Sequence, residues 1–220
     1  MANPSLLEDV EFAENPEPRC ACVLLLDTSG SMSGAPIDAL NKGLQTFQER
    51  LIKDKLASRR VEVAIVTFDS AVHIIQEFVT ADHFQPPTLT AQGGTDMAGG
   101  IQQALDMIQA RKVQYRTHGV TYYRPWVFMI TDGEPNAGYE QAAQRLKEEE
   151  NQKRVAFFAV GVEGANMTRL QEIVVRTPLK LIGLNFQEMF VWLSASMQKI
   201  SNSKDENQVA MDSPAGWGKL

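Results

Sequence analysis

The sequence predicts an α/β fold, with a doubly wound and mostly parallel sheet that has helices on both faces. The first observation is a set of nearly continuous apolar runs, such as residues 20–27 and 126–133, which are typical of strands buried on both faces. The second is that amphipathic helical stretches separate these runs along the chain. Strands that alternate with helices form parallel sheets with right-handed crossovers.

The first half of the chain supplies two buried strands, one edge strand and two helices. After the strand at residues 20–27, an apolar stripe at helical spacing predicts a helix with these inward residues: Ile37, Leu40, Leu44, Phe47 and Leu51. Residues 61–69 form the second predicted strand, and residues 72–79 follow after a very short connection. Only an antiparallel hairpin can be joined so briefly, so residues 72–79 are predicted to form an antiparallel edge strand. A second helical stripe consists of Met97, Ile101, Ala104 and Ile108.

The second half continues the alternation. The strand at 126–133 is followed by a predicted helix at 138–153 and a strand at 155–162. A short helix at 167–174 leads to a last strand at 179–184. A strong apolar stripe predicts the final helix, with these inward residues: Phe186, Met189, Phe190, Leu193, Met197 and Ile200.

The chain divides into a polar lead-in at residues 1–18, one domain at 19–201 and a tail at 202–220. The lead-in lacks the basic region and the apolar core of a secretory leader, and no apolar run approaches the ~18 residues needed to cross a bilayer. We therefore expect a cytoplasmic protein that does not bind membranes. The tail is polar, and Trp217 is the large apolar residue expected to anchor it.

Charge and cysteine content argue against two further classes of site. The net charge is −6, whereas nonspecific binding of nucleic acid needs a basic surface. Two cysteines, Cys20 and Cys22, and three histidines are too few for a closed zinc site of the usual spacing. We interpret both cysteines as small apolar strand residues in a reducing compartment.

Oxygen-bearing side chains follow two of the predicted strands. Asp27, Ser29 and Ser31 leave the first strand at a spacing of two residues, which can bring alternate side chains to one side of a loop. Thr95 lies in a loop flanked by glycines, and Asp132 ends a later strand. Ligands of open α/β sheets bind beyond the carboxyl ends of strands, where the two aspartates meet if their strands are neighbours. Carboxylate and hydroxyl oxygens suit Mg²⁺, Mn²⁺ or Ca²⁺ better than Zn²⁺ or copper.

The five residues in this order resemble the metal-ion-dependent adhesion site of von Willebrand factor A domains, which have a Rossmann-like fold. The resemblance covers about residues 20–200. The stretches "LLLDTSGSM", "GGTDM" and "FMITDGEPN" are similar to those of small bacterial TerY-like proteins, which are linked to tellurium resistance and stress response. The resemblance implies a divalent cation at the upper edge of the sheet, with Mg²⁺ as the first choice and Mn²⁺ or Ca²⁺ as alternatives.

The resemblance also implies that a partner protein supplies an aspartate or glutamate to the cation. TerY-like proteins are associated with kinase and phosphatase partners, so the resemblance implies a partner of that kind here. Two further acids stand beside the motif. Asp96 is expected in the second shell of the metal or at the N-cap of the following helix, and Glu134 is expected at the rim of the site.

The leading hypothesis is therefore a metal-dependent protein-binding module and not an enzyme. The first alternative is a Mg²⁺-dependent phosphoryl-transfer enzyme. Phosphatases of the haloacid type need a second carboxylate where Ser29 stands, however, and the loop lacks the lysine of a phosphate-binding loop. The second alternative is a scaffold that no longer binds a metal.

Overall fold

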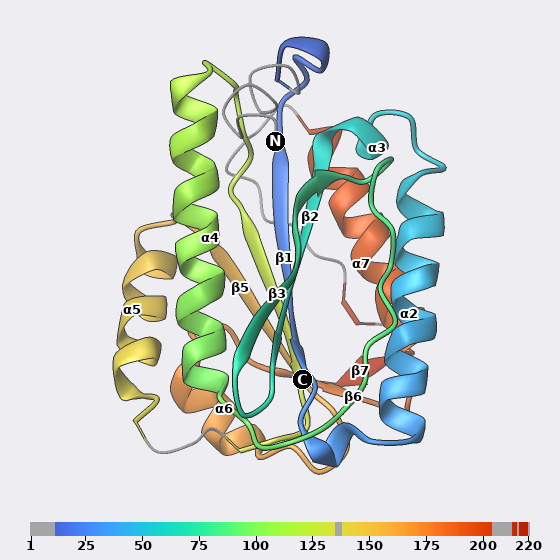
Figure 1. Cartoon of the computed structure of the whole chain (residues 1–220), viewed down its shortest axis with the longest axis vertical. Coiled ribbons are helices and arrows are strands. Elements are labelled where there is room, and N and C mark those ends of the chain that lie inside the picture. The colour runs from blue at the N-terminus through green and yellow to red at the C-terminus, as the bar shows by residue number, and fades with distance from the viewer. Residues whose placement is uncertain (1–11, 135–137, 204–212, 215, 220) are drawn as a thin grey trace, which may run out of the picture.

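A seven-stranded sheet in the order β3-β2-β1-β4-β5-β6-β7 forms the centre of the computed structural model (Figure 1). The structure describes residues 12–134, 138–203, 213, 214 and 216–219. The five inner strands run parallel, and an antiparallel strand lies at each edge. The strands are β1 (Cys20–Asp27), β2 (Val61–Phe68), β3 (Val72–Thr80), β4 (Trp126–Thr131), β5 (Ala156–Gly161), β6 (Leu179–Leu181) and β7 (Gly218–Lys219). The predicted α/β fold with an antiparallel edge strand is confirmed, and the short β7 adds a second antiparallel edge.

Each predicted helix is present, with ends that differ from the prediction by a few residues. These helices are α2 (Ala35–Leu51), α4 (Met97–Thr117), α5 (Glu140–Asn151), α6 (Met167–Ile173) and α7 (Phe186–Ser201). Two short helices, η1 (Gly30–Met32) and α3 (Ala57–Arg60), were not predicted, because a single turn is too short to show a helical period. Over the described part of the chain, no helix is both long and apolar enough to span a bilayer.

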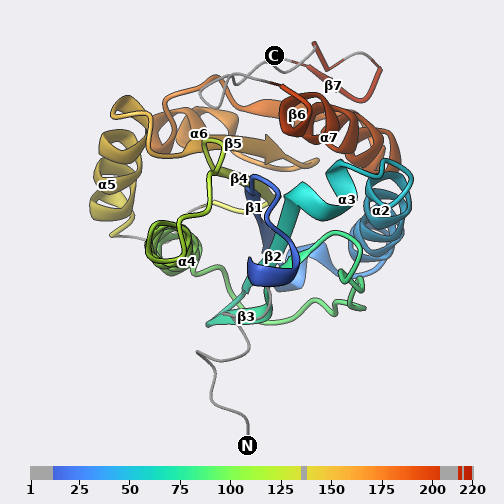
Figure 2. The same ribbon diagram turned by 90° about the horizontal axis from the view of Figure 1, so that it is seen from above.

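Two separate cores cover the two faces of the sheet, and β1 contributes to both. Leu24 and Leu26 pack with α2 and α7, whereas Val23 and Leu25 pack with α4, α5 and α6. Figure 2 shows these two groups of helices on opposite sides of the sheet. Every residue of β1 is buried, which is why its sequence is an unbroken apolar run rather than an alternating one.

The two cysteines belong to this buried strand, as predicted. Cys20 and Cys22 are both free thiols with no exposed surface. Burial disfavours the thiolate and raises the pKa of Cys22 to about 12. Both residues therefore act as small apolar core residues.

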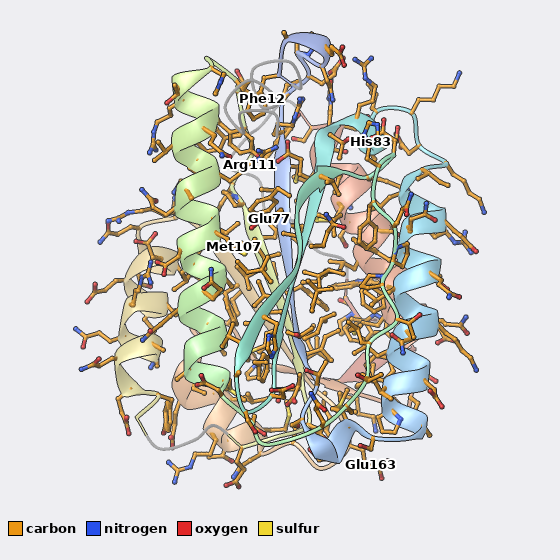
Figure 3. All side chains as sticks on the ribbon, in the orientation of Figure 1. Phe12, Glu77, His83, Met107, Arg111 and Glu163 are labelled. Atoms are coloured by element: carbon orange, nitrogen blue, oxygen red, sulfur yellow. The ribbon has the colours of Figure 1, made fainter. Side chains whose placement is uncertain are left out.

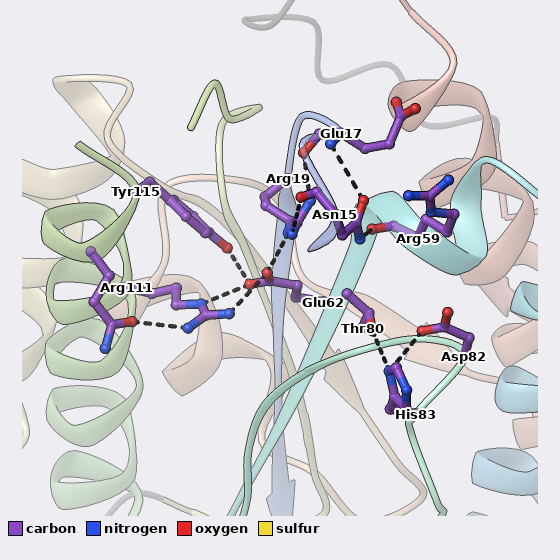
Figure 4. Close-up of polar contacts among 11 residues, drawn as sticks. Asn15, Glu17, Arg19, Arg59, Glu62, Thr80, Asp82, His83, Arg111 and Tyr115 are labelled. Carbon is purple, nitrogen blue, oxygen red and sulfur yellow. Dashed lines mark hydrogen bonds and ion pairs between the residues drawn. The ribbon is translucent and has the colours of Figure 1, made fainter. Parts of the chain in front are cut away.

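A buried charged cluster holds the amino end of the sheet together (Figure 4). The fully buried carboxylate of Glu62 accepts hydrogen bonds from Nε of Arg19 and Nε of Arg111, both at 2.8 Å. It also accepts one from the hydroxyl of Tyr115. The ring of Phe12 covers both guanidinium groups, at 5.5 Å from Cζ of Arg19 and 4.9 Å from Cζ of Arg111. The end of the lead-in is thus packed on the domain.

Trp217 anchors the end of the chain, as predicted. Its side chain is 1% exposed, and its ring lies 4.9 Å from that of Trp192 on α7. The carbonyl of Trp217 accepts a hydrogen bond from the backbone of Ile182 at 2.8 Å. These contacts place β7 beside β6 at the edge of the sheet.

Gly43 of α2 is predicted to resist substitution, because α7 lies directly against it. A Cβ atom at residue 43 would lie only 2.5 Å from Cδ2 of the buried Phe190 ring. In an open helix, Gly→Ala would stabilise by about 1 kcal/mol, but overpacking a core costs about 1–3 kcal/mol. We expect Gly43→Ala to lower the free energy of unfolding by about 1–2 kcal/mol. Urea denaturation followed by far-ultraviolet circular dichroism measures it.

The control for Gly43→Ala is the same change combined with Phe190→Leu, because the smaller side chain makes room for the added methyl group. The double variant should lose less stability than the two single variants added together. Strictly additive losses would contradict the direct contact.

Candidate metal centre

The predicted ligands gather at the carboxyl ends of β1 and β4. These strands are parallel neighbours, with Leu26 opposite Ile130, so the residues that follow them leave the sheet side by side. The chain passes from β1 to β2 on one side and returns to β4 on the other, so the strand order reverses at this point. Figure 3 labels Glu163, which follows β5, at this end of the molecule and Phe12 at the opposite end. The two strands are neighbours, as the prediction required, so the backbones of Asp27 and Asp132 leave the sheet at the same edge.

Asp27 is a fully buried carboxylate that has no basic partner among the residues that the structure describes. Its Oδ1 accepts a hydrogen bond from the backbone N–H of Ser29 at 2.8 Å, and its Oδ2 accepts one from Thr131 Oγ1 at 2.5 Å. None of the lysine, arginine or histidine side chains that the structure describes forms an ion pair with it. Burial raises the pKa of Asp27, and the charge of Asp132 adds to this, although the hydrogen bonds from Ser29 and Thr131 oppose both.

Hydroxyl groups connect the two aspartate loops. Oγ of Ser29 and Oγ of Ser31 are 3.0 Å apart, within hydrogen-bond distance. Ser31 Oγ in turn donates to Oδ1 of Asp132 at 2.8 Å. Ser29 is buried, whereas Ser31 is exposed and Asp132 is half-buried. The polar cluster thus runs from the buried end of β1 to the surface.

Gly133 shows that Thr95 belongs to the same cluster. A Cβ atom at residue 133 would lie 3.3 Å from both Asp27 Oδ2 and Thr95 Oγ1, and 3.1 Å from Thr95 Cγ2. Any larger residue would fill the space between the aspartate and the threonine. The backbone of Gly30 donates to the carbonyl of Gly93 at 3.0 Å, which ties the loop of Thr95 to the loop that follows β1. Thr95 Oγ1 makes no hydrogen bond to any described residue.

The two flanking acids have contacts outside the cluster. Asp96 is the N-cap of α4, as one of its two predicted roles, and its Oδ1 accepts from the backbone of Gly99 at 3.0 Å. Glu134 is exposed, and its Oε1 accepts from Nδ2 of Asn166 at 2.7 Å. Its place beside Asp132 remains a predicted rim position.

Two residues of the cluster were missed at the level of the sequence. Thr131 supplies the hydrogen bond to Asp27, and Gly133 leaves the space between Asp27 and Thr95. The signal for Thr131 in the sequence was its place directly before Asp132. Its contact with Asp27 depends on the strand register, in which Leu26 lies opposite Ile130. Gly133 had no such signal, since its role depends on a loop that is remote in the sequence.

The donor set fits a hard divalent cation. It holds two carboxylates, from Asp27 and Asp132, and the hydroxyls of three residues: Ser29, Ser31 and Thr95. Among the residues that the structure describes, no three His, Cys, Asp or Glu side chains group closely enough to hold a metal. The donors named above are all oxygens, which favours Mg²⁺, Mn²⁺ or Ca²⁺ over zinc.

Comparison with known proteins gives one family model and several relatives. A model described as von Willebrand factor type A domain matches residues 22–181. Calcium-activated chloride channel regulator 1 of Macaca mulatta is 35% identical over 126 residues, which cover 54% of this chain and 12% of that protein. The collagen alpha-6(VI) chain of Homo sapiens is 25% identical over 182 residues, which cover 77% of this chain and 7% of that protein. The chain therefore spans only a small part of the length of these relatives.

Solved structures share the fold at low sequence identity. The von Willebrand factor type A protein from Catenulispora acidiphila has a TM-score of 0.64 and 18% identity, with 82% of this chain and 43% of that chain covered. The pilus adhesin SpaC from Lactobacillus rhamnosus GG, in its open conformation, has a TM-score of 0.66 and 15% identity, with 83% and 30% covered. At such identities the likeness shows the fold alone.

The curated relatives contradict the predicted cytoplasmic location. They include a collagen chain, which is an extracellular protein. The prediction depended on the absence of a leader in residues 1–18, and such an absence does not decide where a protein is found.

The family match extends over the part of the chain that builds the sheet and the cluster. Residues 22–181 run from within β1 to the end of β6 and include the loops that follow β1 and β4 and the loop of Thr95. Matched structures from two bacteria share the same arrangement of sheet and helices. The chain belongs to the von Willebrand factor type A domain family.

Proposed function

We propose that the chain is a metal-ion-dependent protein-binding module, which captures an acidic residue of a partner through a divalent cation. The observation that carries this proposal is the buried carboxylate of Asp27, which has hydroxyl neighbours and a second carboxylate but no basic partner among the described residues. A buried charge without a partner is costly, and a bound cation would remove that cost. Mg²⁺ is the proposed cation, with Mn²⁺ or Ca²⁺ as alternatives.

The charges of the donor set explain why a partner would be needed. Asp27 and Asp132 would hold the cation together with the hydroxyls of Ser29, Ser31 and Thr95. Two carboxylates balance one divalent cation, and hydroxyls add no charge, so a bound cation would keep affinity for one more anionic oxygen. Ser31 and Asp132 lie toward the surface, where an aspartate or glutamate of a partner could reach the site.

Family membership supports binding rather than catalysis. Von Willebrand factor type A domains are mainly interaction and adhesion modules. A phosphatase of the haloacid type would need a second carboxylate two residues after Asp27, where this chain has Ser29. A phosphate-binding loop would need a lysine, which the loop after β1 lacks. The alternative is a scaffold that binds no metal. The calorimetric titration described below distinguishes the two, because only the proposed module would bind a divalent cation.

The resemblance to TerY-like proteins supports a more specific setting. We propose that the partner is a kinase or phosphatase of a bacterial system for stress response and tellurium resistance. This part of the proposal depends on the three stretches around the ligands and not on their geometry. The capture experiment described last in this subsection would identify the class of partner.

Asp27→Ala is expected to abolish binding of the cation while the fold is retained, because Asp27 is the buried carboxylate of the set. Calorimetric titration of Mg²⁺, then Mn²⁺ and Ca²⁺, into the metal-stripped full chain measures this. Asp38→Ala is the matched control, since Asp38 lies in the first turn of α2 outside the cluster. Unchanged Mg²⁺ binding by Asp27→Ala would show that the site is assigned to the wrong residues. If the wild type binds no cation, the metal-free scaffold is favoured.

Asp27→Asn is expected to stabilise the chelated protein by about 1 kcal/mol, because it removes a buried charge while an amide can keep hydrogen bonds. Added Mg²⁺ should stabilise the wild type by about 2.7 kcal/mol at a hundredfold excess over its Kd, and should leave Asp27→Asn unchanged. Thermal unfolding with chelator and with Mg²⁺ measures both effects. A chelated variant that is less stable than the wild type would show that the charge is already compensated.

Thr95→Ala is expected to weaken capture of the partner more than it weakens the fold, because Thr95 lies in a loop and its hydroxyl bonds no described residue. The immobilised full chain would be incubated with lysate in Mg²⁺ or in chelator, and the retained proteins identified by mass spectrometry. Thr95→Ser keeps the hydroxyl and is the control that should still capture the partner. Equal capture by Thr95→Ala and wild type counts against the proposal.

A further inference from the structure

A basic pocket lies at the end of the sheet opposite to the metal ligands. It has a volume of about 520 Å³, which falls within the range of pockets for small ligands. Four cationic side chains line it, and no acidic residue does: Lys112, Arg124, Lys153 and Arg154. In a chain with a net charge of −6, this is a local concentration of positive charge.

The topology explains why these residues meet. Arg124 lies two residues before β4, and Lys153 and Arg154 lie just before β5, so all three lie where neighbouring parallel strands begin. Lys112 reaches the same place from α4. The metal ligands follow the other end of β4, which is six residues long, so the two sites are about 20 Å apart.

Lys112 is a nearly buried cation without a carboxylate partner in the described chain. The residue is 6% exposed, and its Nζ donates one hydrogen bond, to the backbone carbonyl of Arg154 at 3.3 Å. Burial lowers the pKa of Lys112, and the charges of Arg116 and Arg154 lower it further, while Glu149 opposes them. The ammonium group has spare donors, and no ion pair joins it to a carboxylate of the described residues.

Arg124 is held in place with one edge of its guanidinium group available. Nε donates to the carbonyl of Val155 at 2.9 Å, and Nη2 donates to the carbonyl of Glu150 at 3.0 Å. Within the described residues Nη1 donates no hydrogen bond. Fixed guanidinium groups with free N–H donors bind planar or tetrahedral oxyanions well.

Lys153 occupies a backbone position that favours glycine. Its φ is +58°, and it alone among the described non-glycine residues has a positive φ. It follows the end of α5, where glycine commonly ends a helix, and its N–H donates to the carbonyl of Glu150 at 2.9 Å. A lysine here is conformationally unfavourable, so its charge is a candidate reason for its presence.

The nearby carboxylates are already paired. Glu149 binds Nη1 of Arg154 at 2.8 Å, and Glu150 binds Nε of Arg176 at 2.5 Å. Neither acid lines the pocket, so Lys112, Arg124 and Lys153 meet no carboxylate within it. From outside the lining, Glu149 attracts Lys112 and Glu150 attracts Arg124.

We propose that this pocket binds a phosphate group, carried by a small phosphorylated molecule or by a phosphorylated side chain. A phosphate monoester has a charge near −2 and three terminal oxygens, which can meet several donors at once. A single carboxylate offers one charge and two oxygens to the same three cations. The pocket is independent of the metal ligands, since it is built at the other ends of the strands.

Titration of the full chain with inorganic phosphate tests the proposal. Chelator is present throughout, so that a cation at the Asp27 site cannot bind the phosphate, and ionic strength is held constant with chloride. Amide shifts in two-dimensional NMR spectra report the binding. We expect saturable shifts in the amides of residues 120–124 and 153–155.

Two variants locate the binding. Lys112→Met keeps the apolar stem, and Lys153→Gly relieves the backbone strain, so the second variant should fold at least as well as the wild type. Each should raise the Kd for phosphate about tenfold, as expected for loss of one charged hydrogen bond. Lys42→Met on α2, outside the pocket, is the control and should leave the Kd unchanged. The proposal is overturned if the wild type shows no saturable binding, or if both pocket variants bind like the wild type.

Two further probes distinguish the source of the phosphate. One is glucose 6-phosphate, and the other is a short phosphoserine peptide with its unphosphorylated form as the blank. If one of these probes binds more tightly than its form without phosphate, the proposal is supported, and that probe identifies the kind of molecule that carries the phosphate. The proposal is contradicted if glucose 6-phosphate binds no more tightly than glucose and the phosphoserine peptide binds no more tightly than its unphosphorylated form.

Discussion

Parallel pairing of β1 with β4 is the constraint on which the rest of the structure depends. These strands are distant in the sequence, and their pairing brings two strand-end aspartates to one edge of the sheet. It also fixes where the strand order reverses, because β2 lies on the other side of β1. Each strand is buried on both faces, so a shift of the pairing by one residue would exchange the two cores as well as separate the aspartates.

Glu62 and Asp27 are both buried carboxylates in strands of this sheet, but they have different hydrogen-bond partners. Glu62, near the amino end of β2, accepts hydrogen bonds from two guanidinium groups and a tyrosine hydroxyl. Asp27, at the carboxyl end of β1, accepts hydrogen bonds from Ser29 and from the hydroxyl of Thr131, and no cation of the described residues pairs with it. The same fold therefore supplies internal cations at one end of the sheet and none of the described ones at the other. This contrast supports the view that the charge of Asp27 is compensated from outside the chain.

The sequence predicted best those features that depend on a single continuous segment of the chain. Unbroken apolar runs predicted the buried strands, and the stripe from Ile37 to Leu51 predicted α2, because burial on a face depends on local periodicity. The five candidate ligands were predicted from their order, and hydrogen bonds or close approach now bring them into one cluster. Gly133 and the basic pocket were not predicted, since their roles arise only where segments far apart in the sequence meet. The location of the protein was predicted wrongly, because it does not follow from the forces that fold the chain.

The burial of the tryptophans has a practical consequence for spectroscopy. All three indoles, Trp126, Trp192 and Trp217, pack in or against the core between the sheet and the α2–α7 pair. The opposite core, under α4, α5 and α6, contains no tryptophan in the described chain. Tryptophan fluorescence therefore reports directly on one face of the sheet, whereas the other core holds a tyrosine, Tyr115, and not a described tryptophan. Agreement between fluorescence and a probe of the α4 face would be needed before unfolding could be called a single cooperative transition.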